Sequence, residues 1–166
     1  MIEIKYQVDF ADYIRLMFQI AYRRWTYIII TLLGVIQLPL IVAMFIMPSL
    51  YNPNSLTSSI MLIIFAFMMP MLLYFRTRAY YFGNHALQQE TRAAFNSDCI
   101  EFTGKKMQQV RLSWERIRRV QETKDWIIFY QTKYFFNFVP KSAFKTSGEI
   151  EKLRKIIRNK THIVFR

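Results

Sequence analysis

The side chains with the clearest potential for chemistry are six cations between positions 105 and 119. They are Lys105, Lys106, Arg111, Arg116, Arg118 and Arg119. Clustered lysines and arginines attract phosphate and carboxylate groups, and each cation beside an anionic membrane contributes about 1 kcal/mol of binding. The cluster therefore predicts contact with an anionic lipid surface or with a protein partner. A solvated charged face is the alternative interpretation, because blocks of like charge are often only hydrated.

Side chains suited to catalysis or metal binding are few and scattered. His85 and His162 are the only histidines, 77 positions apart and without carboxylates at ligand spacing. No Gly-rich phosphate loop or nucleophile elbow is present, so we expect no enzyme activity, cofactor or metal site. The single cysteine, Cys99, excludes an intramolecular disulfide and is expected to be a small buried residue. The acidic residues near the cations are expected to form ion pairs; these are Glu115, Glu122 and Asp125.

Short strands must position the cations, because apolar and β-branched stretches alternate with turn residues after about residue 91. The predicted strands cover 92–95, 99–102, 107–113, 117–122, 126–131 and 135–139. Thr146 and Glu149 predict a capping box ahead of a helix over about 147–159. A small antiparallel sheet closed by one amphipathic helix is a pleckstrin-homology-like arrangement. Trp114 is expected in the core or at the rim of this sheet.

Two uncharged apolar runs precede this domain. Residues 25–47 and 56–75 are each long enough to cross a membrane as a helix, and no ionisable side chain occurs in residues 25–75 apart from tyrosine. They are joined by a turn rich in Pro, Asn and Ser. This pattern predicts a transmembrane hairpin, and hence an α+β membrane protein. Gln37 is expected to form a hydrogen bond between the two helices.

The distribution of cations predicts the orientation of the hairpin. Residues 76–166 contain 19 Lys and Arg against eight Asp and Glu, a net charge of +11, and the turn at 48–55 contains none. Because positive flanks favour the cytoplasmic side, both termini are expected in the cytoplasm. The expected location is the cytoplasmic (inner) membrane of the cell. Nucleic acid is not an expected partner, because no nucleic-acid fold signature is present.

The N-terminal 24 residues are expected to form a strand and an amphipathic helix. Ile2, Ile4, Tyr6 and Val8 alternate with polar residues, and an open sheet edge in the domain would need cover. We therefore predict that residues 2–8 add an edge strand to the domain. Residues 10–24 are expected to be helical, on the bilayer surface or packed on the domain. The apolar stripe of this helix is predicted at Ile14, Met17, Phe18, Ala21 and Tyr22.

One motif resembles a known family. It runs from Leu112 through Trp114, Ile117 and Val120 to Glu122, and continues at Pro140, Lys141 and Phe144 before the terminal helix. This order and spacing resemble the YcxB-like family of bacterial membrane proteins, whose members also carry an N-terminal strand and two membrane helices. The resemblance implies a bacterial inner-membrane protein with a pleckstrin-homology-like cytoplasmic domain, and it implies no reaction. The basic stretch from Arg111 to Arg119 lies outside the family pattern.

The expected organisation has four segments. They are an N-terminal strand and helix at 1–24, the hairpin at 25–75, a juxtamembrane helix at 76–90 and the YcxB-like domain at 91–166. The expected function is that of a membrane-anchored, non-enzymatic interaction module that presents a basic domain at the membrane surface. The alternative is an accessory subunit of a membrane transport or envelope-synthesis complex, which would contact its partner through the hairpin.

Overall fold

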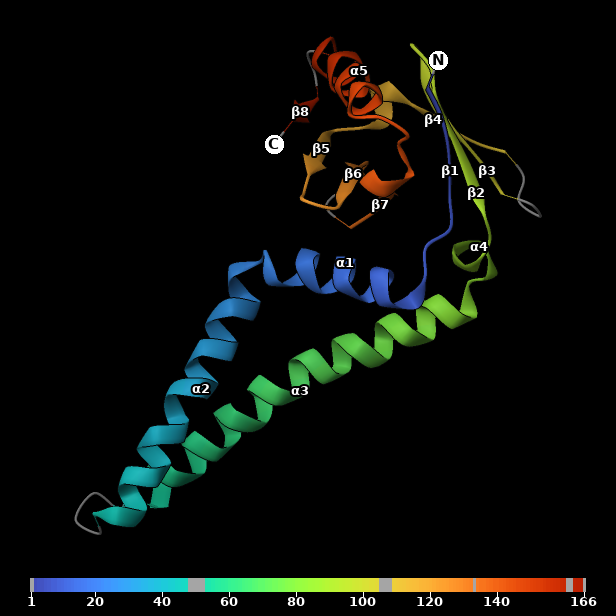
Figure 1. The fold of residues 1–166 in the computed structure, drawn as a ribbon. Helices are drawn as coiled ribbons and strands as arrows, with labels where there is room; N and C mark the ends of the chain where they lie inside the picture. Colours follow the sequence, from blue (N-terminus) through green and yellow to red (C-terminus); the bar gives the residue numbers. More distant parts are fainter. Residues whose placement is uncertain (1, 48–52, 105–108, 133, 161–162, 166) are drawn as a thin grey trace. The chain divides into compact units, whose positions relative to one another are not determined.

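The chain folds into two compact units. The computed structural model describes residues 2–47, 53–104, 109–132, 134–160 and 163–165 (Figure 1). Phe10–Gly83 form one unit, which we call the helical unit, and Met1–Asp9 with Asn84–Arg166 form the other, which we call the strand unit. The N-terminal strand and the helix that follows it therefore belong to different units. The hairpin is an insertion in the strand unit.

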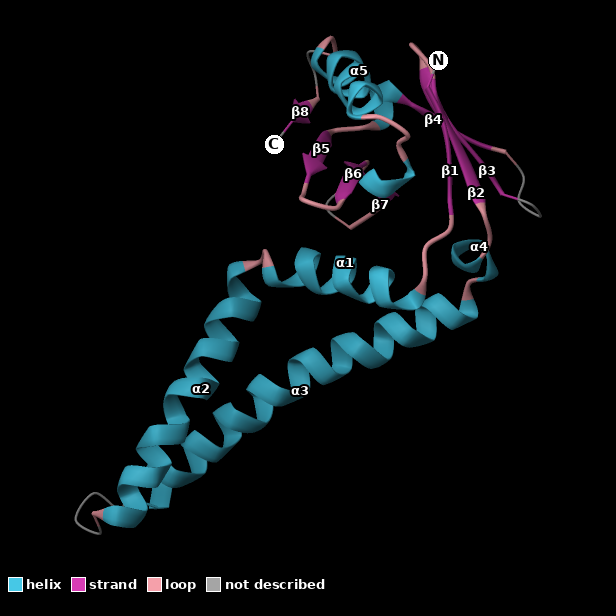
Figure 2. Cartoon of the chain, in the orientation of Figure 1, coloured by secondary structure: helices cyan, strands magenta, loops and turns pink. Residues whose placement is uncertain are grey.

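Among the described residues, the helical unit consists of three helices, which Figure 2 draws in cyan. They are α1 at Phe10–Tyr22, α2 at Trp25–Ile46 and α3 at Pro53–Gly83. Both α2 and α3 are long and apolar enough to cross a membrane, with mean hydropathy of 2.6 and 2.2. Helix α3 includes the predicted run at 56–75 and continues to Gly83, where the next residue, Asn84, caps the short helix α4 at His85–Gln88.

Small and polar residues join α2 to α3. A methyl group added at Gly34 would lie 2.2 Å from Cβ of Ala66, so the two backbones approach more closely than any larger residue would allow. The Ser59 hydroxyl donates a hydrogen bond of 2.8 Å to Oε1 of Gln37. The predicted interhelical hydrogen bond of Gln37 is therefore confirmed. It satisfies an amide group that would be costly to leave unpaired among apolar side chains.

Helix α1 packs on α3 through aromatic rings. The Phe10 ring lies 5.5 Å from that of Tyr81, and the Tyr13 ring lies 5.6 Å from the same side chain. The buried residues of α1 are Tyr13, Leu16 and Ala21. Of the predicted apolar stripe, Ala21 is buried, and Ile14, Met17, Phe18 and Tyr22 are half-buried. The expected position of this stripe, on the bilayer surface or packed on the domain, stays a prediction.

The strand unit contains two four-stranded sheets. The first has the order β1-β2-β3-β4, with strands at Ile2–Tyr6, Thr91–Phe95, Cys99–Gly104 and Val110–Ser113. The second has the order β7-β6-β5-β8, with strands at Phe136–Pro140, Trp126–Tyr130, Arg119–Glu122 and Val164–Phe165. The predicted strands of the domain are confirmed within the described residues, although β4 and β5 begin later than predicted, and residues 107–108 of one predicted strand lie outside the described residues. Strand β8, which pairs with β5 in parallel, was not predicted from the sequence.

The predicted edge strand at the N-terminus is confirmed. Strand β1 pairs antiparallel with β2, from Ile2 opposite Phe95 to Tyr6 opposite Thr91. Ile2 and Ile4 are buried in the core, and Tyr6 packs against it. The Tyr6 hydroxyl also donates a hydrogen bond of 3.2 Å to the carbonyl oxygen of Phe138 in β7. Strand β1 therefore closes one edge of the first sheet and also contacts the second.

Helix α5, at Ser147–Arg158, covers the core between the sheets. Leu153 and Ile157 of this helix are buried in one cluster with Trp114 and Phe129. The predicted capping box is wrong in detail. Thr146 occupies the N-cap position but makes no side-chain cap bond, and the Glu149 carboxylate accepts a hydrogen bond from the backbone N–H of Lys145 instead. Two short 3-10 turns complete the unit, at Trp114–Arg116 and Lys141–Ala143.

Candidate functional site

The family motif forms the structural centre of the strand unit. Its apolar members, Leu112, Trp114, Ile117, Val120 and Phe144, all belong to the buried core. The Trp114 indole N–H donates a hydrogen bond of 2.9 Å to the carbonyl oxygen of Asn96, so its polar group is satisfied inside the core. The expected core position of Trp114 is confirmed.

The charged members of the motif contact each other. Glu122 at the end of β5 accepts from Lys141 Nζ at 2.5 Å, and Lys141 follows Pro140, the last residue of β7. Arg154 of α5 binds both oxygens of the Glu122 carboxylate, through Nε at 3.0 Å and Nη2 at 2.6 Å. One carboxylate therefore links a strand, a turn and the helix. Bidentate contacts of this kind fix orientation as well as supplying energy.

These contacts perturb the acidity of Glu122. Hydrogen bonding to Arg154, assisted by Lys141, lowers the pKa of the Glu122 carboxyl to about 2, although partial burial acts in the opposite direction. The side chain is 15% exposed, so solvent screens the ion pairs only partly. The predicted ion pairing is confirmed for Glu122. Among the described residues Glu115 and Asp125 have no ion pair, so that prediction was wrong for them; both are exposed.

Three of the six predicted cations gather at the start of β5; we call Arg116, Arg118 and Arg119 the arginine cluster. Arg116 and Arg118 are exposed. The Arg118 backbone N–H donates to the carbonyl oxygen of Tyr130, the last residue of β6, at 2.9 Å. The Arg119 guanidinium carbon lies 4.2 Å from the centre of the Tyr130 ring, a cation–π distance. The cluster therefore lies beside the end of β6.

Arg111 has a different environment. Its Nε lies 2.7 Å from Glu101 Oε1 on the neighbouring strand β3, where the two residues are directly opposite. The hydrogen bond from Arg111 lowers the pKa of the Glu101 carboxyl. The positive charge of Arg111 is thus already paired within the sheet. Lys105 and Lys106, the remaining predicted cations, lie outside the described residues.

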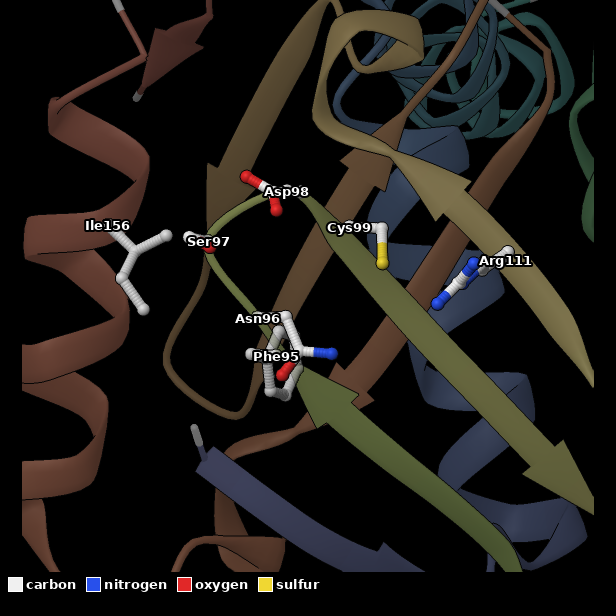
Figure 3. Close-up of a pocket in the computed structure, with 7 residues that line it drawn as sticks. All are labelled: Phe95, Asn96, Ser97, Asp98, Cys99, Arg111 and Ile156. Carbon is white, nitrogen blue, oxygen red and sulfur yellow. The ribbon is translucent and has the colours of Figure 1, made fainter.

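A pocket of about 730 Å³ lies where β2 turns into β3 (Figure 3). Figure 3 shows Ile156 of α5 on one side and Cys99 and Arg111 on adjacent strands on the other. Cys99 is half-buried rather than fully buried as expected, and its thiol lies 3.7 Å from Glu101 Oε1. Because Glu101 neutralises Arg111, the pocket presents no unpaired cation from that side chain. The turn residues at 96–98 were predicted as a turn, but nothing in the sequence indicated a pocket.

Sequence analysis missed two exposed aromatic residues between β6 and β7. Tyr134 and Phe135 are 71% and 63% exposed. Phe135 was predicted as the first residue of a strand, but β7 begins at Phe136. We call Tyr134 and Phe135 the aromatic tip. The preceding turn signal at Thr132-Lys133 indicated where the hairpin reverses, but not that two rings project from it.

The remaining candidates do not assemble. His85 is the exposed first residue of α4, and His162 lies outside the described residues. Among the described residues no group of three or more His, Cys, Asp or Glu side chains is placed to hold a metal ion.

Comparison with known proteins gives one match. Residues 95–157 match the family model described as YcxB-like protein. No curated protein and no solved structure matches the chain. The matched region runs from the end of β2 to Ile157 of α5, and it includes every residue of the motif.

Proposed function

We propose, from the match of residues 95–157 to the YcxB-like family model, that the chain is a membrane-anchored, non-enzymatic interaction module of this family. Its α2 and α3 cross the cytoplasmic membrane of a bacterium, both termini are cytoplasmic, and the strand unit is a pleckstrin-homology-like domain at the membrane surface. Two four-stranded sheets, antiparallel except for the β5–β8 pair, with one helix packed on their shared core support this description of the domain. The partner is an anionic lipid surface or an unidentified membrane protein.

One observation carries the proposal: the apolar hairpin is inserted between two paired strands. Tyr6 and Thr91 are opposite each other in the sheet, and paired strands place such Cα atoms about 4.5–5.5 Å apart. The chain leaves this sheet at Tyr6, the last residue of β1, and returns to it at Thr91, the first residue of β2, after the helices. A domain attached at two adjacent points has little freedom to move away from its anchor. This arrangement suits a domain that acts at the membrane rather than in bulk solution.

The exposed surface of the hairpin supports the membrane part of the proposal. Large apolar side chains on α2 and α3 are exposed along both helices, among them Phe45 at 75% and Phe67 at 66%. A patch of this extent is rare on soluble proteins. Hydroxyl groups on these helices donate to backbone carbonyls one turn earlier, for example Thr31 to Tyr27 at 2.8 Å. Such bonds satisfy hydroxyl groups that would find no water to bind in a lipid environment.

Cysteine labelling in intact bacterial cells tests the proposed topology. In a Cys99→Ser background, Asn52→Cys should react with an impermeant maleimide, and Lys124→Cys should react only after the cells are permeabilised. In the sequence Asn52 lies between the two apolar runs, outside the described residues, and Lys124 lies in the strand unit between β5 and β6. The reverse pattern overturns the orientation, and recovery of the chain in the soluble fraction overturns the anchoring.

The alternative, an accessory subunit that contacts its partner through the hairpin, makes a different prediction. The polar groups of Gln37 and Ser59 are bonded to each other within the hairpin. Because these two groups bind each other, they are less available to a partner protein, which favours a role of the hairpin as an anchor. Photocrosslinking from Val35, which is 54% exposed on α2, would distinguish the two. Specific capture of one membrane protein from Val35, with none from Arg118, would favour the accessory subunit.

A further inference from the structure

We propose that the aromatic tip and the arginine cluster together form a docking surface for the anionic lipid bilayer. The proposal rests on the proposed membrane anchoring and assigns its lipid-contacting surface. In it, Tyr134 and Phe135 enter the interfacial layer, and Arg116 and Arg118 contact lipid phosphates. Interfacial insertion of aromatic rings and attraction of arginine to anionic lipid are independent contributions that act in the same place.

The aromatic tip is exceptional within the strand unit. Among its described residues, Tyr134 and Phe135 are the only exposed aromatic side chains, and the others are buried or half-buried. Exposing two adjacent large rings to water forgoes the burial that stabilises the other rings of the unit. A lipid interface is a suitable environment, because a tyrosine there buries its ring while its hydroxyl remains hydrated.

The backbone holds the tip in a defined shape. The N–H groups of Gln131 and Thr132 both donate to the carbonyl oxygen of Phe135, at 3.0 and 3.2 Å. The Thr132 hydroxyl oxygen accepts from the N–H of Tyr134 at 3.2 Å and from that of Phe135 at 3.0 Å. These four hydrogen bonds join the described residues on the two sides of position 133. A turn that is held by such bonds before docking loses less entropy on docking.

The arginine cluster adjoins this turn through the sheet. Arg118 is hydrogen-bonded to Tyr130, and Gln131 begins the turn that projects the rings. Val164 of β8, which is 49% exposed, donates its N–H to the carbonyl oxygen of Arg118 at 3.2 Å. The surface thus combines cations and apolar side chains. Glu115 is the only acidic residue in the segments 114–119 and 130–136, so the net charge of the surface is positive.

The tip also lies close to the points where the chain leaves the strand unit. Tyr6, three residues before the end of the N-terminal segment of this unit, is hydrogen-bonded to Phe138. Phe138 is three residues after Phe135, a span of about 10 Å along an extended strand. The tip and the exit toward α1 are therefore in the same part of the strand unit.

Fluorescence quenching in the full chain tests the proposal. Single cysteines at Gln131, Lys124 and Leu40, in a Cys99→Ser background, carry an environment-sensitive fluorophore in protein reconstituted into phosphatidylcholine vesicles with or without phosphatidylglycerol. Gln131 adjoins the tip and leaves its rings intact, and Lys124 lies at the opposite end of β6. Leu40, exposed on α2, reports whether the hairpin is in the bilayer.

Nitroxide lipids should quench the label at Leu40 in both vesicle types and leave the label at Lys124 unaffected. The label at Gln131 should be quenched by headgroup nitroxides, more strongly with phosphatidylglycerol, and less as salt rises. Arg116→Gln with Arg118→Gln should weaken docking about fivefold for each arginine. Phe135→Ser should also reduce quenching. The matched control is Lys152→Gln with Lys155→Gln, an equal loss of charge from exposed positions on α5, which should leave quenching unchanged.

The outcomes separate this proposal from the proposed function. Loss of quenching at Leu40 contradicts membrane anchoring itself. Quenching at Leu40 without quenching at Gln131 leaves the anchoring intact and overturns the docking surface. A label at Gln131 that is shielded from aqueous iodide but not quenched by lipid also overturns it, because a protein would then cover the tip. Equal loss in the α5 control would show that only total charge matters, which likewise contradicts the assigned surface.

Discussion

The two units of the chain bury opposite kinds of side chain. In α2 and α3 the buried residues are Gly34, Ser59, Ala66, Thr77 and Tyr81, whereas aliphatic and aromatic residues are exposed along both helices. In the strand unit the largest fully buried side chains include Trp114, Phe95 and Phe129. Small residues in the contact and large apolar residues outside are typical of helices packed in lipid, where burial of apolar surface gives no driving force. The packing of α2 and α3 thus agrees with the proposed membrane anchoring, and the strand unit has the core of a domain folded in water.

Because the two units bury different side chains, the same substitution should have different effects at Trp114 and at Trp25. Trp114→Ala should destabilise the strand unit by about 3–5 kcal/mol, because it leaves a cavity in the core and removes the donor to Asn96. Trp25→Ala removes the same side chain from α2, where it is 75% exposed, and should leave the strand unit unchanged. Hydrogen exchange of β3, followed by mass spectrometry in the full chain, measures both. Equal protection in the two variants would contradict the assigned core.

The N-terminal strand gives the next largest effect. Ile4→Ala should destabilise the strand unit by about 2–4 kcal/mol, since Ile4 is 3% exposed and packs in the core. Lys5→Ala changes the neighbouring residue, which faces the opposite side of β1 and is exposed, so its effect should be within about 0.5 kcal/mol. Thermal unfolding followed by limited proteolysis of β2 compares them. If the two variants melt together, β1 contributes little to the domain.

The ion pairs of Glu122 should make the stability of the strand unit depend on pH. Glu122→Gln should cost about 2 kcal/mol near neutral pH, because it leaves Lys141 and Arg154 without their anion. The folded-state pKa of about 2 lies below the ordinary value of 4.5, so this stabilisation is present above about pH 4.5 and is lost as pH falls toward 2. Urea denaturation at several pH values measures it. A variant that loses as much stability on acidification as the parent would contradict this assignment.

The smallest effect concerns the contact between α2 and α3. Gly34→Ala should weaken the packing of these helices by about 1–2 kcal/mol, because the added methyl meets Cβ of Ala66 at 2.2 Å. Gly83→Ala is the matched control, since no atom lies within 4 Å of a methyl group at that position. Disulfide crosslinking between cysteines at Val35 and Leu62 reports helix proximity. An unchanged crosslinking yield in Gly34→Ala would show that α2 and α3 accommodate the added methyl group without moving apart.

Local patterns were sufficient to predict most elements. Two uncharged runs predicted α2 and α3, and period-two alternation predicted β1 and the strands of the domain, because these signals depend on neighbouring residues. The distant pairing of β1 also followed, since an open edge needs cover and Ile2 and Ile4 needed a core. The division into two sheets did not follow, because strand pairing is decided by contacts far apart in the sequence. Strand β8 has two residues, too few for any period.

The candidate site was predicted only in part. The run of cations was evident from the sequence. The different environments of Arg111 and of the arginine cluster were not. Arg111 is paired because Glu101 lies opposite it across two strands, a relation that depends on register. Tyr134 and Phe135 looked like ordinary strand residues, since composition alone does not distinguish a ring in the core from one at a turn. The exposed fractions of these two side chains depend on the whole fold, and they show that both rings lie outside the core.

The pairing of β1 with β2 also determines when the strand unit can close during synthesis. Strand β1 leaves the ribosome before the hairpin does, and its partner at Thr91–Phe95 is translated some 85 residues later. At about 5–20 residues per second, β1 waits roughly 4–17 s for that partner. Both apolar helices are made within this interval. The sheet therefore forms only after the hairpin has been translated, and a nascent chain stalled before Thr91 carries a strand that has no partner in this sheet.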